Sequence, residues 1–293
     1  MVSVDLVISQ ILTGLSMGSW LFLVAIGLSL VFGVLGVLNF AHGMLFAIGS
    51  YAAVSVVEGI TGNFLLGVVA AALVVGVVGA IIEMGFIRHL YGRAEEELDQ
   101  LLLTFAFVLI LEDLVRGIFG SGTRNLSPPG ILQGRLTISG FSMSNYRLFV
   151  IFMSIAVMAG ILVVLRTTNF GRVVRATESD RDMALLLGID VPRLYTRVFF
   201  LSAALAGIAG AFAAPIQSVT PALGEQVIIN AFVIVAIGGL GSLGGSFVAA
   251  YIVGLMIAIG SIFAGGAGQL MPFLALILVL LIKPEGLFGG AQT

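Results

Sequence analysis

Residues 10–37 read QILTGLSMGSWLFLVAIGLSLVFGVLGV and contain no charged side chain. An α-helix needs about 20 consecutive apolar residues to cross the roughly 30 Å hydrocarbon core of a bilayer, so this stretch predicts a transmembrane helix. Comparable apolar stretches follow near residues 40–58, 64–82, 100–119, 148–165, 198–216, 226–240, 247–264 and 270–282. The pattern predicts an all-α polytopic bundle of about eight to ten helices, with about nine as the working count. The short stretches at 226–240 and 270–282 are alternatively re-entrant or tilted.

The composition points to lipid as the main solvent of the chain. Of its 293 residues, 59% are hydrophobic and 10% are charged, whereas a soluble domain has about 45–50% apolar and about 25% charged residues. The apolar runs recur from end to end, so we expect a single transmembrane domain over residues 1–293. Because the runs are continuously apolar and not alternating, the pattern excludes a β-barrel.

Several classes of site and partner are excluded by residue counts. There is no cysteine, so disulfides and thiolate metal sites are not available. His42 and His89 lie far apart, and we expect no metal centre. The net charge is −2 and the arginines are scattered, so nucleic acid is not an expected partner. No Lys or Arg precedes the first apolar run, which therefore lacks the basic region of a cleavable signal peptide and should be retained.

Basic residues are unequally divided between the two sides implied by nine spans. Segments 83–99, 166–197 and 283–293 share one side, which holds nine of the 13 basic residues. They are Arg88, Arg93, Arg166, Arg172, Arg175, Arg181, Arg193, Arg197 and Lys283. Because basic residues favour cytoplasmic loops, we expect this side to be cytoplasmic, the amino terminus outside and the carboxyl terminus inside. The 120–146 segment, which contains no Asp or Glu, would then be external.

The hydrophilic stretch RVVRATESDRDMALLLGIDVPRLYTRVF runs from Arg172 to Phe199 and holds a short predicted helix over 178–188. Thr177 or Ser179 is the expected N-cap, and Gly188 permits a left-handed stop. The helix start carries the acidic residues Glu178, Asp180 and Asp182, which suit the positive end of its dipole. Apolar residues recur at helical spacing at Met183, Leu186 and Leu187. Such a helix either rests on lipid headgroups or docks a soluble motor.

The same stretch resembles the cytoplasmic coupling loop of the branched-chain amino-acid ABC permease family, LivH type. In that loop an Arg-Ala pair leads to Ala-x-x-x-Gly-Ile, and those positions here are Arg175, Ala176, Ala184, Gly188 and Ile189. LNFAHGMLFAIGSY (38–51), IGGLGSLGG (237–245) and KPEGLFG (283–289) are similar to further segments of the family, although Ser50 replaces an expected alanine. The resemblance covers almost the whole chain and implies that these loop residues, with Glu178 and Asp180, couple to an ATPase.

The resemblance also implies a function and a set of partners. The chain would be the membrane-spanning permease subunit of an ATP-binding-cassette importer for branched-chain or related amino acids, in a bacterial or archaeal inner membrane. The implied partners are two ATP-binding-cassette ATPase subunits, a second LivM-like permease subunit, an external solute-binding protein and membrane lipid. A phosphate-binding loop needs Lys followed by Ser or Thr, but the only lysine, Lys283, precedes Pro284. We therefore expect no enzyme activity and no cofactor in this chain, and ATP and Mg²⁺ in the ATPase subunits.

Polar residues and glycines at two helix breaks are candidates for the transport pathway or its inner gate. They are Asn39, His42, Gly238, Gly239 and Gly241. The alternative is structural: Asn39 caps a helix beginning near Phe40, and His42 bonds a neighbouring carbonyl.

Other charged residues have simpler expectations. Arg124 and Arg135 are candidates for docking an anionic face of the binding protein, with ordinary loop charges as the alternative. Glu112 and Arg116 have the spacing of a helix-surface ion pair. Glu83, close to Arg88, is expected either to contact another subunit or to face solvent.

Two other functions stay open on the sequence. An importer of the same class could carry urea, short amides or aromatic acids. An ion-coupled secondary transporter or channel would instead need buried chains of Asp, Glu or His, and the sequence offers few such groups.

Overall fold

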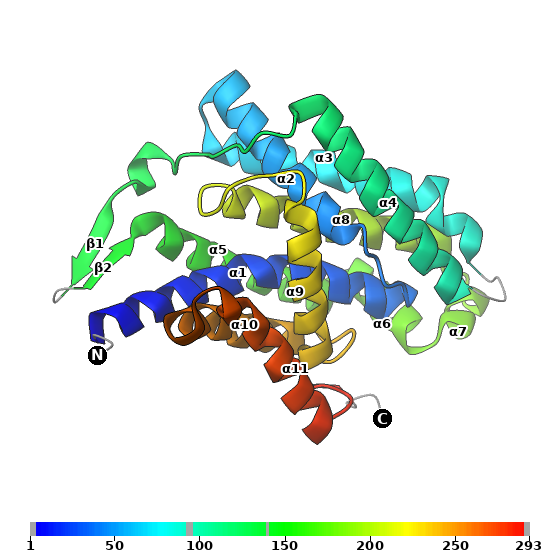
Figure 1. Cartoon of the computed structure of the whole chain (residues 1–293). Coiled ribbons are helices and arrows are strands. Elements are labelled where there is room, and N and C mark those ends of the chain that lie inside the picture. Colours follow the sequence, from blue (N-terminus) through cyan, green and yellow to red (C-terminus); the bar gives the residue numbers. More distant parts are fainter. Residues whose placement is uncertain (1–3, 92–95, 139–140, 290–293) are drawn as a thin grey trace.

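The computed structural model describes residues 4–91, 96–138 and 141–289; Arg93, assigned above to the cytoplasmic side, lies outside them. Within the described part the chain forms eleven α-helices and one two-stranded hairpin (Figure 1). The α-helices are α1 (Val4–Leu35), α2 (His42–Val56), α3 (Phe64–Gly85), α4 (Glu96–Phe119), α5 (Asn145–Thr167), α6 (Asn169–Ser179), α7 (Arg181–Leu186), α8 (Val191–Ala213), α9 (Leu223–Gly238), α10 (Leu243–Ala264) and α11 (Met271–Ile282). The strands are β1 (Arg135–Ile138) and β2 (Phe141–Ser144), and short π or 3-10 turns cover Val57–Thr61, Ile87–Leu90, Gly130–Leu132 and Gly265–Leu270.

Seven helical segments of the described chain are long and apolar enough to cross a membrane. They correspond to seven of the nine predicted spans and confirm a polytopic helical bundle. The predicted span at 100–119 forms α4, whose last two turns contain Glu112, Asp113 and Arg116. The predicted span at 226–240 forms α9, whose 16 residues are fewer than the about 20 needed to cross a bilayer.

Helix α1 forms the centre of the bundle (Figure 1). It packs against α5, α8, α9 and α10, and its side chains from Leu21 to Ile26 have no exposed surface. A helix that is apolar on all sides is stable only where every side is covered. The uninterrupted stretch at 10–37 therefore becomes the core of the molecule, whereas α3 and α5 leave one face exposed.

Small residues bring helix backbones into contact, as expected from their spacing. A Cβ atom built on Gly207 of α8 would lie 2.5 Å from the carbonyl oxygen of Ala71 in α3. One built on Gly49 of α2 would lie 2.5 Å from Cα of Gly207. Because a real side chain cannot occupy such a space, these glycines allow α2, α3 and α8 to pack closely.

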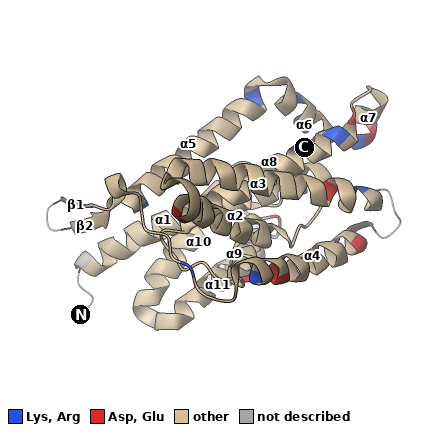
Figure 2. Ribbon diagram, turned by 90° about the horizontal axis from the view of Figure 1, so that it is seen from above, with Lys and Arg blue, Asp and Glu red and all other residues tan. Residues whose placement is uncertain are grey.

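The two ends of the bundle carry different structures. The start of α1 lies beside the hairpin of β1 and β2, and the end of α1 lies beside α6, which leads into α7 (Figure 1). Helix α5 connects the ends, since it begins directly after β2 and ends directly before α6. Segments 120–146 and 166–197 therefore lie at opposite ends. Figure 2 shows charged residues around α6 and α7 and along α4, while the ribbon between the ends is mostly uncharged.

The predicted Glu112–Arg116 pair is confirmed, with 2.6 Å between Arg116 Nη2 and Glu112 Oε1. Both expectations for Glu83 are wrong. Its carboxylate is fully buried within the chain, where it accepts hydrogen bonds from Arg88 at 3.3 Å and from Thr196 at 2.7 Å. The reason is that α8 covers the end of α3, a contact between segments more than a hundred residues apart.

Candidate functional site

The loop between α5 and α8 folds into two short helices, α6 and α7. Neither of them belongs to a candidate membrane span. Thr168 caps α6, because its Oγ1 accepts a hydrogen bond from the Gly171 amide at 3.2 Å. Asp180 caps α7, since its backbone is extended and its Oδ1 accepts from the Met183 amide at 2.9 Å. The prediction of Thr177 or Ser179 as the cap is wrong.

The predicted helix starts at residue 178, about one turn before the observed start of α7 at Arg181. Ser179 is the last residue of α6, and its hydroxyl donates to the Arg175 carbonyl at 3.0 Å. Glu178 also belongs to the end of α6 and not to the start of α7. The predicted stop is confirmed, because Gly188 has φ +81° and the Ile189 amide donates to the Ala184 carbonyl at 3.1 Å. This arrangement closes α7 with a left-handed glycine.

Helix α7 presents an apolar surface at the end of the bundle. Met183, Leu186 and Leu187 are 51%, 82% and 74% exposed, although no candidate span includes them. On the opposite side, Ala184 is only 2% exposed. Arg181 holds the helix in place, with its guanidinium carbon 5.5 Å from the centre of the Tyr195 ring in α8. An exposed apolar cluster outside the spans is typical of an interaction surface, and we call Met183, Leu186 and Leu187 the α7 surface.

The other residues of the coupling prediction lie on both sides of the loop. Ala184 packs inside the chain and faces away from the α7 surface. Ala176 and Asp180 are exposed, and Ile189 is half-buried. Arg175 donates to the Leu165 carbonyl and so ties α6 to the end of α5.

Glu178 connects α6 to the glycine-rich break between α9 and α10. Its Oε1 would lie 3.1 Å from a Cβ atom built on Gly33 of α1 and 4.0 Å from one built on Gly241. A cavity of about 200 Å³ separates the three segments and is lined by Glu178, Arg175, Gly33 and Gly241. Burial raises the pKa of Glu178 above its ordinary value, and the nearby Arg175 guanidinium opposes the rise.

The break itself is packed against the closing segment of the chain. The Leu287 and Phe288 amides donate to the carbonyls of Ile237 and Gly238 at 2.7 and 3.0 Å. Gly239 and Gly241 both have positive φ, +99° and +80°, which favours glycine. The two sequence segments 237–245 and 283–289 thus form one unit, and Glu178 reaches it across a cavity of about 620 Å³ that also borders Pro284 and Glu285.

Asn39 and His42 lie elsewhere in the core. His42 Nε2 is 3.1 Å from the Val24 carbonyl oxygen, which confirms the expected bond to a carbonyl. Asn39 does not cap α2, because that helix starts at His42 without a side-chain cap. The Asn39 amide is buried and has no hydrogen-bond partner among the described residues. No hydrogen bond found in the described chain joins either residue to the break at 238–241.

The two arginines of the 120–146 segment differ in their surroundings. The backbone of Arg124 pairs with Val219, and its guanidinium donates to the Phe119 carbonyl at 3.3 Å and lies 5.3 Å from the Phe119 ring centre. Arg135 is exposed on β1.

The sequence analysis did not select Gly33, although a glycine near the end of a long apolar helix is a signal of close approach between helices.

The fold and this arrangement define a multi-pass helical membrane protein with a loop that extends beyond its candidate spans. The chain belongs to the family described as branched-chain amino acid transport system / permease component, whose model matches residues 10–282.

Named relatives agree with this family, and one solved structure is similar in fold. The high-affinity branched-chain amino acid permease LivH of Escherichia coli is 29% identical over 98% of this chain and 96% of that protein. BraD of Pseudomonas aeruginosa is 29% identical over 98% and 97%, and a probable LivH of Methanocaldococcus jannaschii is 30% identical over 92% and 88%. The structure of PsaBC from Streptococcus pneumoniae in complex with Fab matches with a TM-score of 0.50 and 16% identity, over 94% of this chain and 92% of that chain. At that identity the structure supports the fold alone.

Proposed function

We propose that residues 1–293 act as one permease domain that carries branched-chain or related amino acids across the inner membrane of a bacterium or archaeon. The printed names of the relatives support this solute class. The importer would contain two ATP-binding-cassette ATPase subunits, a LivM-like second permease and an external solute-binding protein. ATP and Mg²⁺ would act in the ATPase subunits.

The α7 surface is the observation that carries the coupling part of this proposal. Its apolar side chains lie at the end of the bundle beyond the candidate spans, where a soluble subunit can reach them. In the same loop, Glu178 lies across a cavity from Gly241 of the break. Movement of an ATPase against α7 would therefore be transmitted through α6 to the junction of α1, α9 and α10, with Gly239 and Gly241 as the flexible points.

The remaining candidate residues would have different roles in this importer. Asn39 and His42 would line or support the pathway from the core. Arg124 and Arg135 lie at the end of the bundle where a binding protein would dock. Arg135 is exposed, whereas the guanidinium of Arg124 donates to the Phe119 carbonyl. The orientation in which α6 and α7 are cytoplasmic rests on the basic-residue bias.

Replacing Leu186 tests the coupling. Leu186→Asp should weaken association with the ATPase by roughly tenfold or more, because a central apolar contact of an interface is lost and a charge is buried. Association is measured by copurification of the co-expressed ATPase with tagged permease. Ile131→Asp is the matched control, since Ile131 is 94% exposed on the 120–146 segment at the other end of the bundle.

Transport in proteoliposomes tests the solute. ATP-driven uptake of labelled leucine, with the binding protein outside, should be competed by isoleucine and valine and lost in Leu186→Asp. Competition by urea, acetamide or phenylalanine in their place would assign a different solute. Uptake driven by an ion gradient without the ATPase would contradict the importer class.

A further inference from the structure

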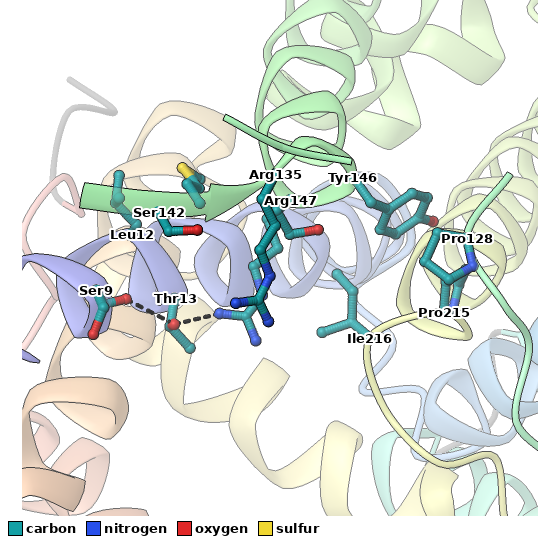
Figure 3. A pocket seen from close by; sticks show the side chains of 12 residues that line it. Ser9, Leu12, Thr13, Pro128, Arg135, Ser142, Tyr146, Arg147, Pro215 and Ile216 are labelled. Carbon is teal, nitrogen blue, oxygen red and sulfur yellow. Dashed lines mark hydrogen bonds between the residues drawn. The ribbon is translucent and has the colours of Figure 1, made fainter. Parts of the chain in front are cut away.

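A pocket of about 340 Å³ lies at the end of the bundle opposite α6 and α7 (Figure 3). Its walls come from the start of α1, the β1–β2 hairpin, the start of α5 and the segment after α8. Two arginines from different elements, Arg135 and Arg147, line it together with Ser9, Thr13 and Tyr146. Figure 3 shows the two arginine side chains running side by side, with their guanidinium groups ending near Thr13.

The hairpin explains why these arginines meet. In the antiparallel register of β1 and β2, Arg135 is opposite Ser144, and Asn145 begins α5 directly after Ser144. The Asn145 amide also donates to the Gly134 carbonyl at 3.1 Å. Arg147, in the first turn of α5, is therefore held next to Arg135, and it donates to the Thr13 hydroxyl of α1.

The pair has no counter-charge in its own pocket. None of the lining residues is acidic, and the salt bridges of the described residues do not include either arginine. The side chain of Asp5, two turns before Thr13 on α1, lies outside the described residues. Two guanidinium groups held together repel each other, so an anion between them is favoured. Arginine binds phosphate oxygens through paired, parallel hydrogen bonds.

The position of the pocket indicates where such an anion comes from. Arg147 is the third residue of α5, and the apolar span of α5 continues immediately after it. Farther along the same helix Phe152 and Ile155 are exposed, as expected of side chains that contact acyl chains. Arg147 thus lies at the start of the α5 span, the depth at which phospholipid headgroups are found, and its partner Thr13 lies in the third turn of α1.

We propose that Arg135 and Arg147 form a binding site for the phosphate group of an anionic phospholipid headgroup, with Thr13 orienting Arg147. The site would anchor the hairpin and the starts of α1 and α5 to the membrane surface at the face opposite the coupling loop. It does not depend on which solute the protein carries.

The test counts retained lipid. The protein is reconstituted into nanodiscs of phosphatidylglycerol and phosphatidylcholine, and lipid that remains bound after extraction into detergent is identified by native mass spectrometry. Wild type should retain phosphatidylglycerol preferentially. Arg135→Gln should lower that preference by about tenfold, because charge-assisted hydrogen bonds to the phosphate are lost. Arg135 is exposed on the hairpin, so this variant tests the site with little risk to folding.

Further variants sharpen the result. Arg147→Gln should have the same effect as Arg135→Gln, and Arg147→Lys should be intermediate, since a lysine keeps the charge but not the planar pair of donors. Arg124→Gln is the matched control, because it removes a positive charge from the same end of the molecule at a residue that does not line the pocket. It should leave lipid retention at the wild-type level.

Three outcomes would overturn the proposal. The first is equal phosphatidylglycerol retention by wild type and Arg135→Gln. The second is thermal stabilisation of detergent-solubilised wild type by inorganic phosphate that matches stabilisation by phosphatidylglycerol, which would indicate a site for a free anion. The third is unchanged lipid retention in Arg135→Gln with weaker capture of the solute-binding protein, which would assign the arginine to protein docking.

Discussion

At the scale of single residues, the buried carboxylate of Glu83 depends on its hydrogen-bond partners. It is fully buried at the end of α3, and Arg88 and Thr196 supply its hydrogen bonds. Arg88→Ala leaves this charge without a cation, so we expect the free energy of unfolding to fall by about 2 kcal/mol. This is less than the usual loss for a wholly buried ion pair, because Arg88 is 35% exposed. Thermal unfolding in detergent, followed by tryptophan fluorescence from Trp20, measures the loss.

The exposed pair of Arg193 and Asp190 is the control for that measurement. Their side chains are 79% and 47% exposed at a distance of 2.9 Å, so Arg193→Ala should change stability by less than about 1 kcal/mol. Equal effects of Arg88→Ala and Arg193→Ala would contradict the structural role assigned to the Glu83 network.

At the scale of elements, the closing segment and the α9–α10 break are held together by backbone contacts. Gly286 has φ +82°, and a Cβ atom built on it would lie 2.6 Å from Cα of Gly239. Gly286→Ala should therefore strain the closing segment at 283–289 or release it from the break. The left-handed backbone alone would raise the free energy of the packed conformation by about 1–2 kcal/mol. Faster hydrogen exchange at the Leu287 and Phe288 amides would report the release.

Gly244 supplies a matched glycine in the same region. It lies in the first turn of α10, and a Cβ atom built on it meets nothing within 4 Å. Gly244→Ala should be neutral or should stabilise the helix by up to about 1 kcal/mol. If both alanine variants exchange at the wild-type rate, the backbone contact does not hold the segment in place.

At the scale of the whole molecule, the structure separates two ends, and the basic-residue bias predicts which end is cytoplasmic. Single cysteines give a clean test because the chain has none of its own. Ser179 in α6 and Ser127 in the 120–146 segment are both exposed. In intact cells a membrane-impermeant thiol reagent should label Ser127→Cys and should label Ser179→Cys only after the membrane is opened. The reverse pattern would invert the orientation.

The sequence by itself determined the features that depend on neighbouring residues. Long uncharged stretches predict spans, because about 20 apolar residues in a row are stable only in lipid or in a core. The i, i+4 spacing predicted the Glu112–Arg116 pair, and Gly188 predicted the end of α7. The resemblance to family segments also implied that the loop at 172–199 couples to an ATPase.

Only the tertiary structure decided which of these segments meet. Glu178 reaches Gly33 and Gly241, Ala184 faces inward, and Arg135 lies beside Arg147 because distant segments pack together. In a membrane protein, side chains that face lipid and those that face another helix are both apolar, so their pattern does not reveal the neighbour. For the same reason the expectations of an exposed or subunit-contacting Glu83 and of a helix cap at Asn39 are wrong: the partner or lack of partner of a buried polar group depends on helices far away in the chain.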